Sequence, residues 1–241
     1  MDTSPGKKSL PQFQSQNPLL CIASFPLTSY FIVTSILCLA SYFFWDREVV
    51  MFMRHHQPKE VHTFFSYVTV LGEGGLWYGL AFLMLIAGWL GLRHGRAAKA
   101  ASFAALKRAG AFFVLSMCSS GLVVVLAKGL IGRMRPRLLW REDLYGLYPF
   151  TFDYSIVSFP SGHTQTIFAA MTVFAVFFPR FRIPFFAFAI LVGASRIFTN
   201  AHFVGDVLMG AFVGICCTIL WKRYFEQHGQ PIRLPLEFFR R

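Results

Sequence analysis

Charged residues are scarce in this chain. They make up 14% of its 241 residues, against 55% hydrophobic and 17% aromatic residues, and the mean hydropathy is +0.52. This composition excludes an ordinary soluble domain and indicates a membrane protein. The five cysteines lie in or beside apolar stretches without metal-ligand spacing, so we expect them to be packing residues and not a disulfide framework. The sequence shows no internal repeat and no second domain.

The apolar stretches determine the expected fold. A helix needs about 20 residues to cross a hydrocarbon core of about 30 Å. Six stretches are candidates, at roughly 26–45, 65–92, 109–131, 163–178, 183–198 and 203–222. The sequence therefore predicts an all-α, polytopic membrane helical bundle with about six transmembrane helices. We expect this membrane domain to span 19–225, between a disordered cytoplasmic tail at 1–18 and a cytoplasmic C-terminal tail at 226–241.

Positive charge dominates the polar part of the chain, whose formal net charge is +12. Such a balance can serve nucleic-acid binding, but most Lys and Arg residues fall on one side of the membrane if both termini are cytoplasmic. This asymmetry follows the positive-inside rule. We therefore expect no nucleic-acid partner and an attraction to anionic membrane lipids. The same topology makes 46–62 an outer loop, with a short interfacial helix around Val49–Met53, and makes 132–162 the longest outer loop.

Three polar clusters interrupt the apolar stretches. They are Lys128 with Arg135, Ser161 to His163, and Ser195-Arg196 followed by His202 and Asp206. The turn at 179–184 joins two helices of similar length into a hairpin, which returns the chain to the membrane face where it started. The helix that ends near the first cluster runs outward by the charge rule, and the last helix starts on that side. We therefore predict that the three clusters meet at the non-cytoplasmic mouth of the bundle.

His202 and Asp206 lie four residues apart at the start of a predicted helix, which stacks them on one face. Asp206 can then accept a hydrogen bond from one imidazole nitrogen and leave the other nitrogen free. This is the orienting role that a carboxylate has in catalytic triads. The alternative is a helix-surface pair in which Asp206 acts as a cap.

Ser161 and Gly162 follow Pro160 and open the next predicted helix. Free N–H groups at a helix start, beside a glycine that permits close approach, can bind phosphate. His163 is placed to donate a proton to a leaving alkoxide or phosphate. The alternative is structural, because Pro-Ser-Gly is a common way to start a helix.

Lys128, Arg135 and Arg196 lie at helix ends, where a cation usually has a partner. Arginine can hold two phosphate oxygens at once, whereas lysine acts as a point charge. The alternative for each is snorkelling toward lipid phosphates. Two further residues have open roles. Ser195 either donates a hydrogen bond in the site or packs, and Glu73 either neutralises a cation in the cavity or links helices.

The clusters form an ordered set of motifs: Lys128-x6-Arg135-Pro136, Pro160-Ser-Gly-His163 and Ser195-Arg196-x5-His202-x3-Asp206. This set resembles the three-part signature of the type-2 phosphatidic acid phosphatases, a lipid phosphatase superfamily that shares its core with vanadium haloperoxidases. The motifs cover about 128–206, and the six-span layout extends the resemblance over roughly 20–225.

The resemblance implies a role for each matched residue. His202 would be the nucleophile that forms a phosphohistidine, with Asp206 orienting it. His163 would protonate the leaving group and later activate water. The transferring phosphoryl group would be stabilised without a metal or other cofactor by Lys128, Arg135, Ser161, Gly162 and Arg196.

The expected function is a metal-independent membrane lipid phosphatase, with undecaprenyl diphosphate, phosphatidic acid, phosphatidylglycerol phosphate and the lipid A phosphates as candidate substrates. The sequence does not select among them. One alternative is a phosphotransferase that passes the phosphoryl group to a second lipid. Another is a non-enzymatic transport or lipid-binding membrane protein. The compact chain and short loops indicate a bacterial inner membrane protein whose site faces the periplasm, with lipids and no obligate protein as partners.

Overall fold

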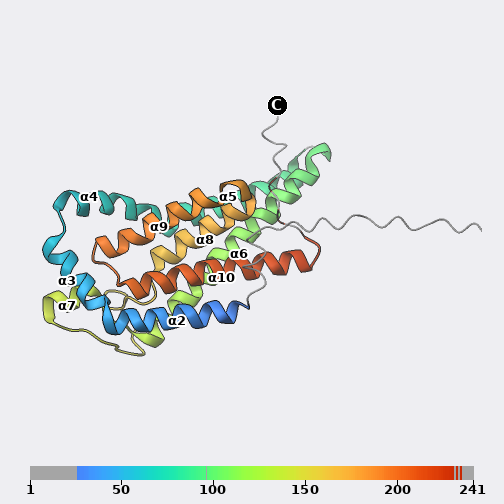
Figure 1. Ribbon diagram of the computed structural model, residues 1–241. Coiled ribbons are helices and arrows are strands. Elements are labelled where there is room, and N and C mark those ends of the chain that lie inside the picture. Colours follow the sequence, from blue (N-terminus) through green and yellow to red (C-terminus); the bar gives the residue numbers. More distant parts are fainter. Residues whose placement is uncertain (1–25, 96, 231, 233, 235–241) are drawn as a thin grey trace, which may run out of the picture.

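The computed structural model describes residues 26–95, 97–230, 232 and 234. Its long helices run side by side in a bundle (Figure 1). These are α2 (Leu27–Phe44), α5 (Gly74–His94), α6 (Ala100–Ile131), α8 (Gly162–Phe177), α9 (Arg182–Phe198) and α10 (Val204–Gln227). Shorter helices are α3 (Asp46–His56), α4 (Lys59–Val68), α7 (Pro136–Glu142) and the 3₁₀ turns η1 (Thr69–Gly72), η2 (Ala97–Lys99) and η3 (Pro179–Phe181).

The centre of the bundle is α8, which packs against α6, α9 and α10. It is buried on most of its sides, as expected for a helix surrounded by other helices, although Thr164, Gln165 and Thr172 are polar. Ile167, Ala169, Ala170 and Val173 are fully buried within the main hydrophobic core. The start of α8 is therefore held on several sides, which positions the Ser161–His163 motif.

The closest helix pair is α5 with α6, and glycine makes the approach possible. A Cβ atom on Gly110 would lie 2.3 Å from the Leu85 nitrogen, and one on Gly88 would lie 2.3 Å from the Lys107 nitrogen. Small residues at such crossings let two backbones touch, as is common between membrane helices. This hairpin anchors α6, whose far end carries Lys128.

Five stretches of the described chain are long and apolar enough to cross a membrane: Leu27–Phe44, Lys59–His94, Ala97–Ile131, Pro179–Phe198 and Val204–Gln227. The sixth predicted span is α8, which has only 16 residues, or about 24 Å of helix. The predicted all-α polytopic membrane bundle is confirmed, whereas the count of six spans is not.

Several predicted boundaries differ from the structure. The span predicted at 109–131 begins at Ala100, because residues 100–105 are rich in alanine, which favours helix. The segment predicted as the outer loop 46–62 is almost entirely helical, since α3 and α4 are separated only by Gln57 and Pro58. At the C-terminus, α10 continues to Gln227, past the predicted end of the domain. The predicted tail at 1–18 lies outside the described residues.

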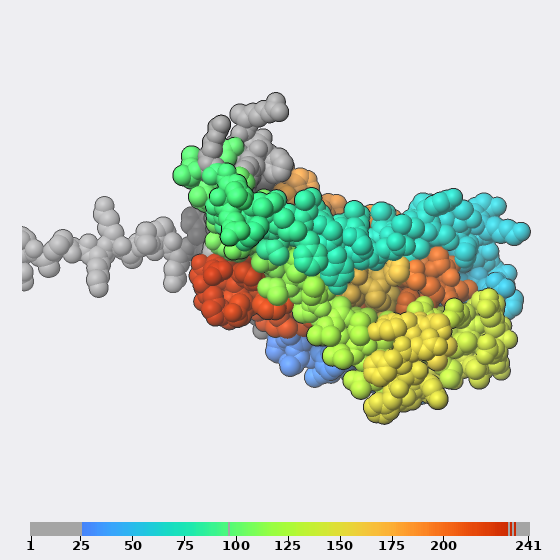
Figure 2. Space-filling view, turned by 180° about the vertical axis from the view of Figure 1, so that it is seen from behind, coloured from blue at the N-terminus to red at the C-terminus, as the bar shows by residue number. Residues whose placement is uncertain are grey.

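The segment between α6 and α8 folds over the end of the bundle where α3 and α7 lie (Figure 1). It turns at Gly132, whose positive φ of 60° and close contact with the Tyr148 carbonyl exclude a side chain. Isolated bridges then pair Arg133 with Leu147 and Met134 with Val157. Figure 2 shows this segment, in yellow-green and yellow, on the surface next to α3. The fold thereby turns one arginine of the segment, Arg133, into the interior.

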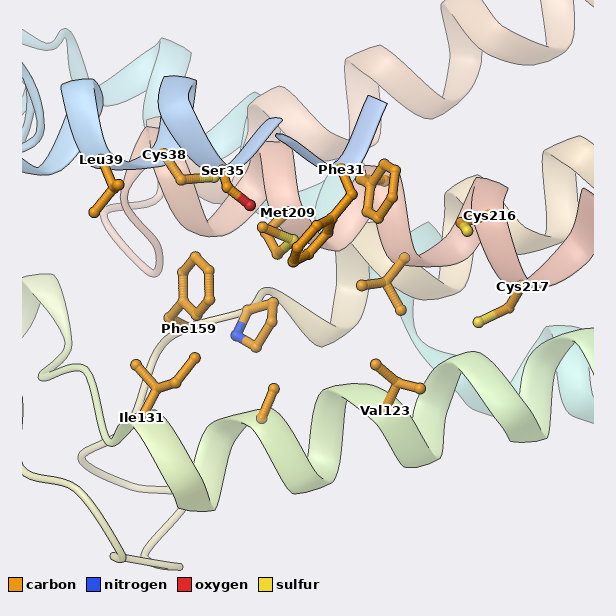
Figure 3. Close-up of a pocket in the computed structure, with 14 residues that line it drawn as sticks. Phe31, Ser35, Cys38, Leu39, Val123, Ile131, Phe159, Met209, Cys216 and Cys217 are labelled. Carbon is orange, nitrogen blue, oxygen red and sulfur yellow. The ribbon is translucent and has the colours of Figure 1, made fainter. Parts of the chain in front are cut away.

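An apolar groove of about 550 Å³ lies between α2, α6 and α10 (Figure 3). Its lining includes Phe31 and Leu39 from α2, Val123 from α6, and Met209 and Val213 from α10. No charged residue lines it. The groove can accommodate hydrocarbon but offers no charge for a phosphate group.

Candidate active site

The predicted pair of His202 and Asp206 is formed. His202 Nδ1 lies 3.2 Å from Asp206 Oδ2, and both side chains are buried. The same carboxylate oxygen accepts the Phe203 N–H at 3.0 Å. Asp206 therefore both contacts the imidazole and caps α10, but the pair is buried and does not lie on the helix surface as the alternative had it.

The turn from α9 into α10 fixes His202 beside Arg196. The backbone N–H groups of Ala201 and His202 both donate to the Arg196 carbonyl, at 3.0 and 3.1 Å. Burial lowers the pKa of His202 to about 3, against the opposing effect of its hydrogen bond to Asp206, and the charges of Lys128 and Arg196 lower the pKa further. The ring is thus neutral at physiological pH. With Nδ1–H donated to Asp206, its Nε2 lone pair is available for attack.

The start of α8 is joined to the start of α10. Ser161 N–H donates to the Asp206 carbonyl at 3.0 Å. The Ser161 hydroxyl oxygen caps α8, accepting the Thr164 N–H at 3.4 Å and the Thr164 hydroxyl at 2.9 Å. Beside Gly162 there is open space, since a Cβ atom there would meet nothing within 4 Å. A phosphate could therefore approach the N–H groups at this helix start.

His163, one residue further, lies under the turn η1. A Cβ atom on Gly72 would lie 3.1 Å from His163 Cβ, which is tighter than an ordinary contact, so glycine favours this close approach of the turn. The charges of Arg196, Arg135 and Lys128 all act on the His163 ring. The predicted general acid and the three predicted phosphate-binding cations are therefore in one electrostatic neighbourhood.

These three cations bind only neutral oxygens. Lys128 Nζ donates to the Ser158 carbonyl at 2.8 Å, and Arg135 Nη2 donates to the Tyr154 carbonyl at 3.0 Å. Arg196 donates to the Thr69 hydroxyl. Its buried Nε has no hydrogen-bond partner, and none of the three pairs with a carboxylate within the described part of the chain. A buried cation ordinarily has a counter-charge, so this arrangement is suited to an anion.

Arg133 and Arg135, two residues apart, show the contrast between paired and unpaired cations. Burial and the neighbouring charge of Arg137 lower the pKa of Arg135. Burial also acts against the charge of Arg133, but the carboxylates of Asp206 and Asp46 outweigh it and raise the pKa of Arg133 above its ordinary value. Arg133 is therefore paired with two carboxylates, whereas Arg135 has no carboxylate partner within the described residues and is available for a ligand.

The two residues with open roles are placed differently from the rest. The Ser195 hydroxyl donates to the Val192 carbonyl of its own helix at 2.6 Å, which favours the packing role. Glu73 is exposed at the start of α5 and forms no ion pair within the described residues, although its charge interacts with that of Arg196. The structure therefore brings neither residue into direct contact with the other site residues.

Sequence reasoning missed Arg133 and Asp46, which it had assigned to outer loops. Both are buried and both lie in the network around Asp206. One signal was available for Arg133, because it lies between Lys128 and Arg135 inside the first motif. Asp46 carried a weaker signal, as one of few acids in the chain, directly after the first apolar stretch.

The side chains around His163 and His202 do not resemble a metal site. Within the described ranges, no three His, Cys, Asp or Glu side chains are grouped so that they could hold a metal ion. The charged groups acting on His163 are cations, and His202 has cations beside its one carboxylate, Asp206; the cations repel a metal ion and attract phosphate. The residues present fit an oxyanion ligand.

A buried imidazole that is bonded to a carboxylate and lies beside cations without carboxylate partners in the described residues is an arrangement suited to an anionic group. Comparison with known proteins identifies the family, because residues 109–230 match the model of the PAP2 superfamily. The chain belongs to this superfamily. The family predicted from the three motifs is thereby confirmed.

Two relatives from bacteria are named lipid A 1-phosphatase. The protein of Rhizobium etli is 31% identical over 179 residues, which are 74% of this chain and 77% of that protein. The protein of Rhizobium johnstonii is 35% identical over 125 residues, which are 52% of this chain and about half, 51%, of that protein. The predicted enzyme class, a lipid phosphatase, agrees with these names.

A solved structure has the same fold. It is the transmembrane PAP2 type phosphatidylglycerolphosphate phosphatase from Bacillus subtilis, with a TM-score of 0.61 and 22% sequence identity. The superposition covers 83% of this chain and 96% of that chain. At this level of identity the comparison supports the fold and not a substrate.

Proposed function

We propose that the chain is a lipid phosphatase that hydrolyses a phosphomonoester at the outer end of its bundle. The observation that carries the proposal is the set of cations Lys128, Arg135 and Arg196, which act on His163 and lack carboxylate partners within the described residues. A phosphate group would supply the missing negative charge. Precise placement of such cations can stabilise a transferring phosphoryl group.

In the proposed reaction, His202 Nε2 attacks the phosphorus atom while the bond to the lipid oxygen breaks. The leaving oxygen takes a proton from His163. Water, deprotonated by His163, then attacks the phosphohistidine, and the P–N bond breaks to release inorganic phosphate. The three cations and the N–H groups at the start of α8 would bind the phosphoryl oxygens throughout.

The first candidate substrate is a phosphate of lipid A, because both relatives described above carry that name. Phosphatidylglycerol phosphate is the second candidate, from the name of a further sequence relative, phosphatidylglycerophosphatase B of Bacillus subtilis, which is 31% identical over 133 residues, or 49% of this chain and 64% of that protein. In either case the hydrocarbon tails would remain in the bilayer and the head group would enter the site sideways.

We also propose that the site faces the periplasm of a bacterial inner membrane and that both termini are cytoplasmic. Basic residues gather at the end of the bundle opposite the site: Arg93, Lys99, Arg180, Arg182, Lys222 and Arg223. An impermeant maleimide applied to intact cells should label Tyr148→Cys and spare Ala97→Cys. The reverse pattern would overturn this orientation.

The test of the reaction is phosphate release by the purified protein in detergent from lipid A, phosphatidylglycerol phosphate, phosphatidic acid and undecaprenyl diphosphate. We expect release from at least one lipid, and adding a second lipid as acceptor distinguishes hydrolysis from phosphotransfer. A folded protein that releases phosphate from none of the four would overturn the proposal.

A further inference from the structure

Arg133 bridges two buried carboxylates. Its Nη1 donates to Asp206 Oδ1 at 2.9 Å, and its Nη2 donates to Asp46 Oδ2 at 2.7 Å. The Tyr145 hydroxyl lies 3.2 Å from the same Nη2, and the guanidinium carbon lies 4.1 Å from the centre of the Phe203 ring. Arg133 is only 3% exposed, so water does not screen these contacts.

Asp46 is fixed from its other side. Its Oδ1 accepts the Ser41 hydroxyl at 2.7 Å and the Val204 N–H at 2.9 Å, and the Gly205 N–H lies 3.4 Å away. One carboxylate oxygen thus ties the junction of α2 and α3 to the first turn of α10. The other oxygen is directed to Arg133, which holds the guanidinium in one orientation.

The charges in this network sum to one negative charge, because Asp46 and Asp206 flank a single arginine. Burial by itself favours the uncharged form of a carboxyl group. The charge-assisted hydrogen bond from Arg133 Nη1 to Asp206 Oδ1 favours the ionised form of Asp206 and leaves its second oxygen for His202. When His202 is phosphorylated on Nε2 and keeps its Nδ1–H, the ring becomes cationic, and the surplus negative charge balances it.

We propose that Arg133 and Asp46 are positioning residues for the nucleophile: they hold Asp206 ionised and aimed at His202 Nδ1, although neither touches the substrate. This inference rests on the proposed role of His202. At metal sites, mutation of the groups that orient a ligand typically costs about 10- to 100-fold in affinity or activity, and we expect an effect of this size here. Loss of the orienting carboxylate itself costs about 10⁴-fold in a serine protease.

The first test is kinetic and uses the full chain in detergent, with Arg133→Gln, Arg133→Lys and Asp46→Asn. We expect kcat to fall about 10- to 100-fold in Arg133→Gln while KM changes less than about two-fold, because the lipid does not contact this network. Arg133→Lys should recover part of the loss by binding one carboxylate. Asp46→Asn keeps the oxygen that caps α10, so its kcat should lie between those of Arg133→Gln and Arg133→Lys.

Tyr145→Phe is the matched control. It removes a neighbour of the Arg133 Nη2 and leaves both carboxylates in place, so kcat should remain within about two-fold of the unchanged protein. A loss in Tyr145→Phe equal to that in Arg133→Gln would overturn the proposal, because local packing alone would then explain both.

The second test does not depend on any substrate. In protein labelled with ¹⁵N-histidine, the His202 signals are assigned by their loss in His202→Asn. The unchanged protein should show the tautomer with the proton on Nδ1, and Arg133→Gln should show a mixture of tautomers. Unchanged His202 signals together with unchanged kcat would overturn the proposal. If the tautomer shifts but the unchanged protein hydrolyses no lipid, the positioning role stands and the proposed function fails.

Discussion

Helix α10 meets two different environments within a few turns. At its start, Asp206 is fully buried and bonded to Arg133 and His202. One turn later Met209, and then Val213, line the apolar groove shared with α2 and α6 (Figure 3). In the charged network both carboxylates are ion-paired and hydrogen-bonded and only Arg133 Nε is buried without a partner among the described residues, whereas the groove is lined mainly by apolar side chains. The comparison indicates that chemistry is restricted to one end of the helix and that the rest serves packing and hydrocarbon.

The largest expected effect on activity comes from a substitution beside the start of α10, where the charged network lies. His202→Asn removes the nucleophile, and we expect phosphate release to fall by about 10⁴-fold or more, with no labelled phosphoenzyme. The measurement is release of labelled phosphate, together with alkali-stable labelling of the protein. His228→Asn, an exposed histidine at the other end of α10, is the control and should retain full activity. Substantial turnover by folded His202→Asn would contradict the assigned nucleophile.

Removal of an unpaired cation should have the next largest effect. Arg196→Gln keeps a hydrogen-bond donor but loses the charge, and we expect kcat to fall by about 10²- to 10³-fold, as for loss of one transition-state donor. Arg47→Gln is the matched control, because Arg47 pairs with Asp143 on the exposed surface at 3.1 Å. Equal losses of kcat in the two variants would show that the effect does not depend on the place of Arg196 in the site.

The effect of His163→Asn should depend on the leaving group. For lipid phosphates we expect a loss of about 10²- to 10⁴-fold, because the alkoxide needs a proton as it leaves. For p-nitrophenyl phosphate, whose leaving group needs little protonation, the loss should be much smaller. His62→Asn, an exposed histidine on α4, serves as the control. A similar loss with both substrates would argue against His163 as the general acid.

Acid should weaken the fold through His202. Its pKa is about 3 in the folded chain and about 6.5 when unfolded. Below pH 6.5 the unfolded chain binds a proton that the folded chain does not. Stability is therefore lost as the pH falls from 6.5 toward 3, by up to about 1.4 kcal/mol per pH unit. Between pH 7.5 and 5 the melting temperature should fall more steeply for the unchanged protein than for His202→Asn. The same pH dependence in both proteins would contradict the lowered pKa of His202.

The smallest effect on activity should come from a substitution in the apolar groove. Val213→Ala removes two methyl groups from a side chain that is 7% exposed, so we expect a loss of about 1 kcal/mol in stability. Activity should stay within about two-fold of the unchanged protein, since the groove holds no charge. Leu220→Ala, on an exposed face of α10, should shift the melting temperature less. A large drop in kcat for Val213→Ala would remove the distinction between the two ends of the helix.

The sequence predicted the placement of residues best where that placement follows from local order at helix ends. The spacing of His202 and Asp206, the helix start at Ser161 and the hairpin turn at 179–184 are all local features, and the charge rule orders them along the membrane. Together they were enough to predict the cluster of Lys128, His163 and His202. They could not predict that Ser195 bonds within its own helix, because that depends on a side-chain rotamer.

The sequence could not predict contacts between residues that lie far apart along the chain. Asp46 and Arg133 are separated by 87 residues, and Arg133 and Asp206 by 73. Asp46 and Arg133 each lie in a polar stretch that predicts a solvent-exposed loop. Their burial results from the folding of the 132–161 segment over the end of the bundle. The helix α4 was missed for a related reason, since Lys59, Glu60 and His62 mask its continuity with the apolar stretch that follows.

The contact between Asp46 and α10 bears on how much of the chain is needed to form the network around Asp206. The family match starts only at residue 109, after α2, α3, α4 and α5. Yet the junction of α2 and α3 supplies one of the two carboxylates on Arg133 and two backbone contacts to α10. A chain shortened to the matched region would therefore lack a component of its reactive centre. For truncation or fusion, the smallest useful unit extends back to Leu27.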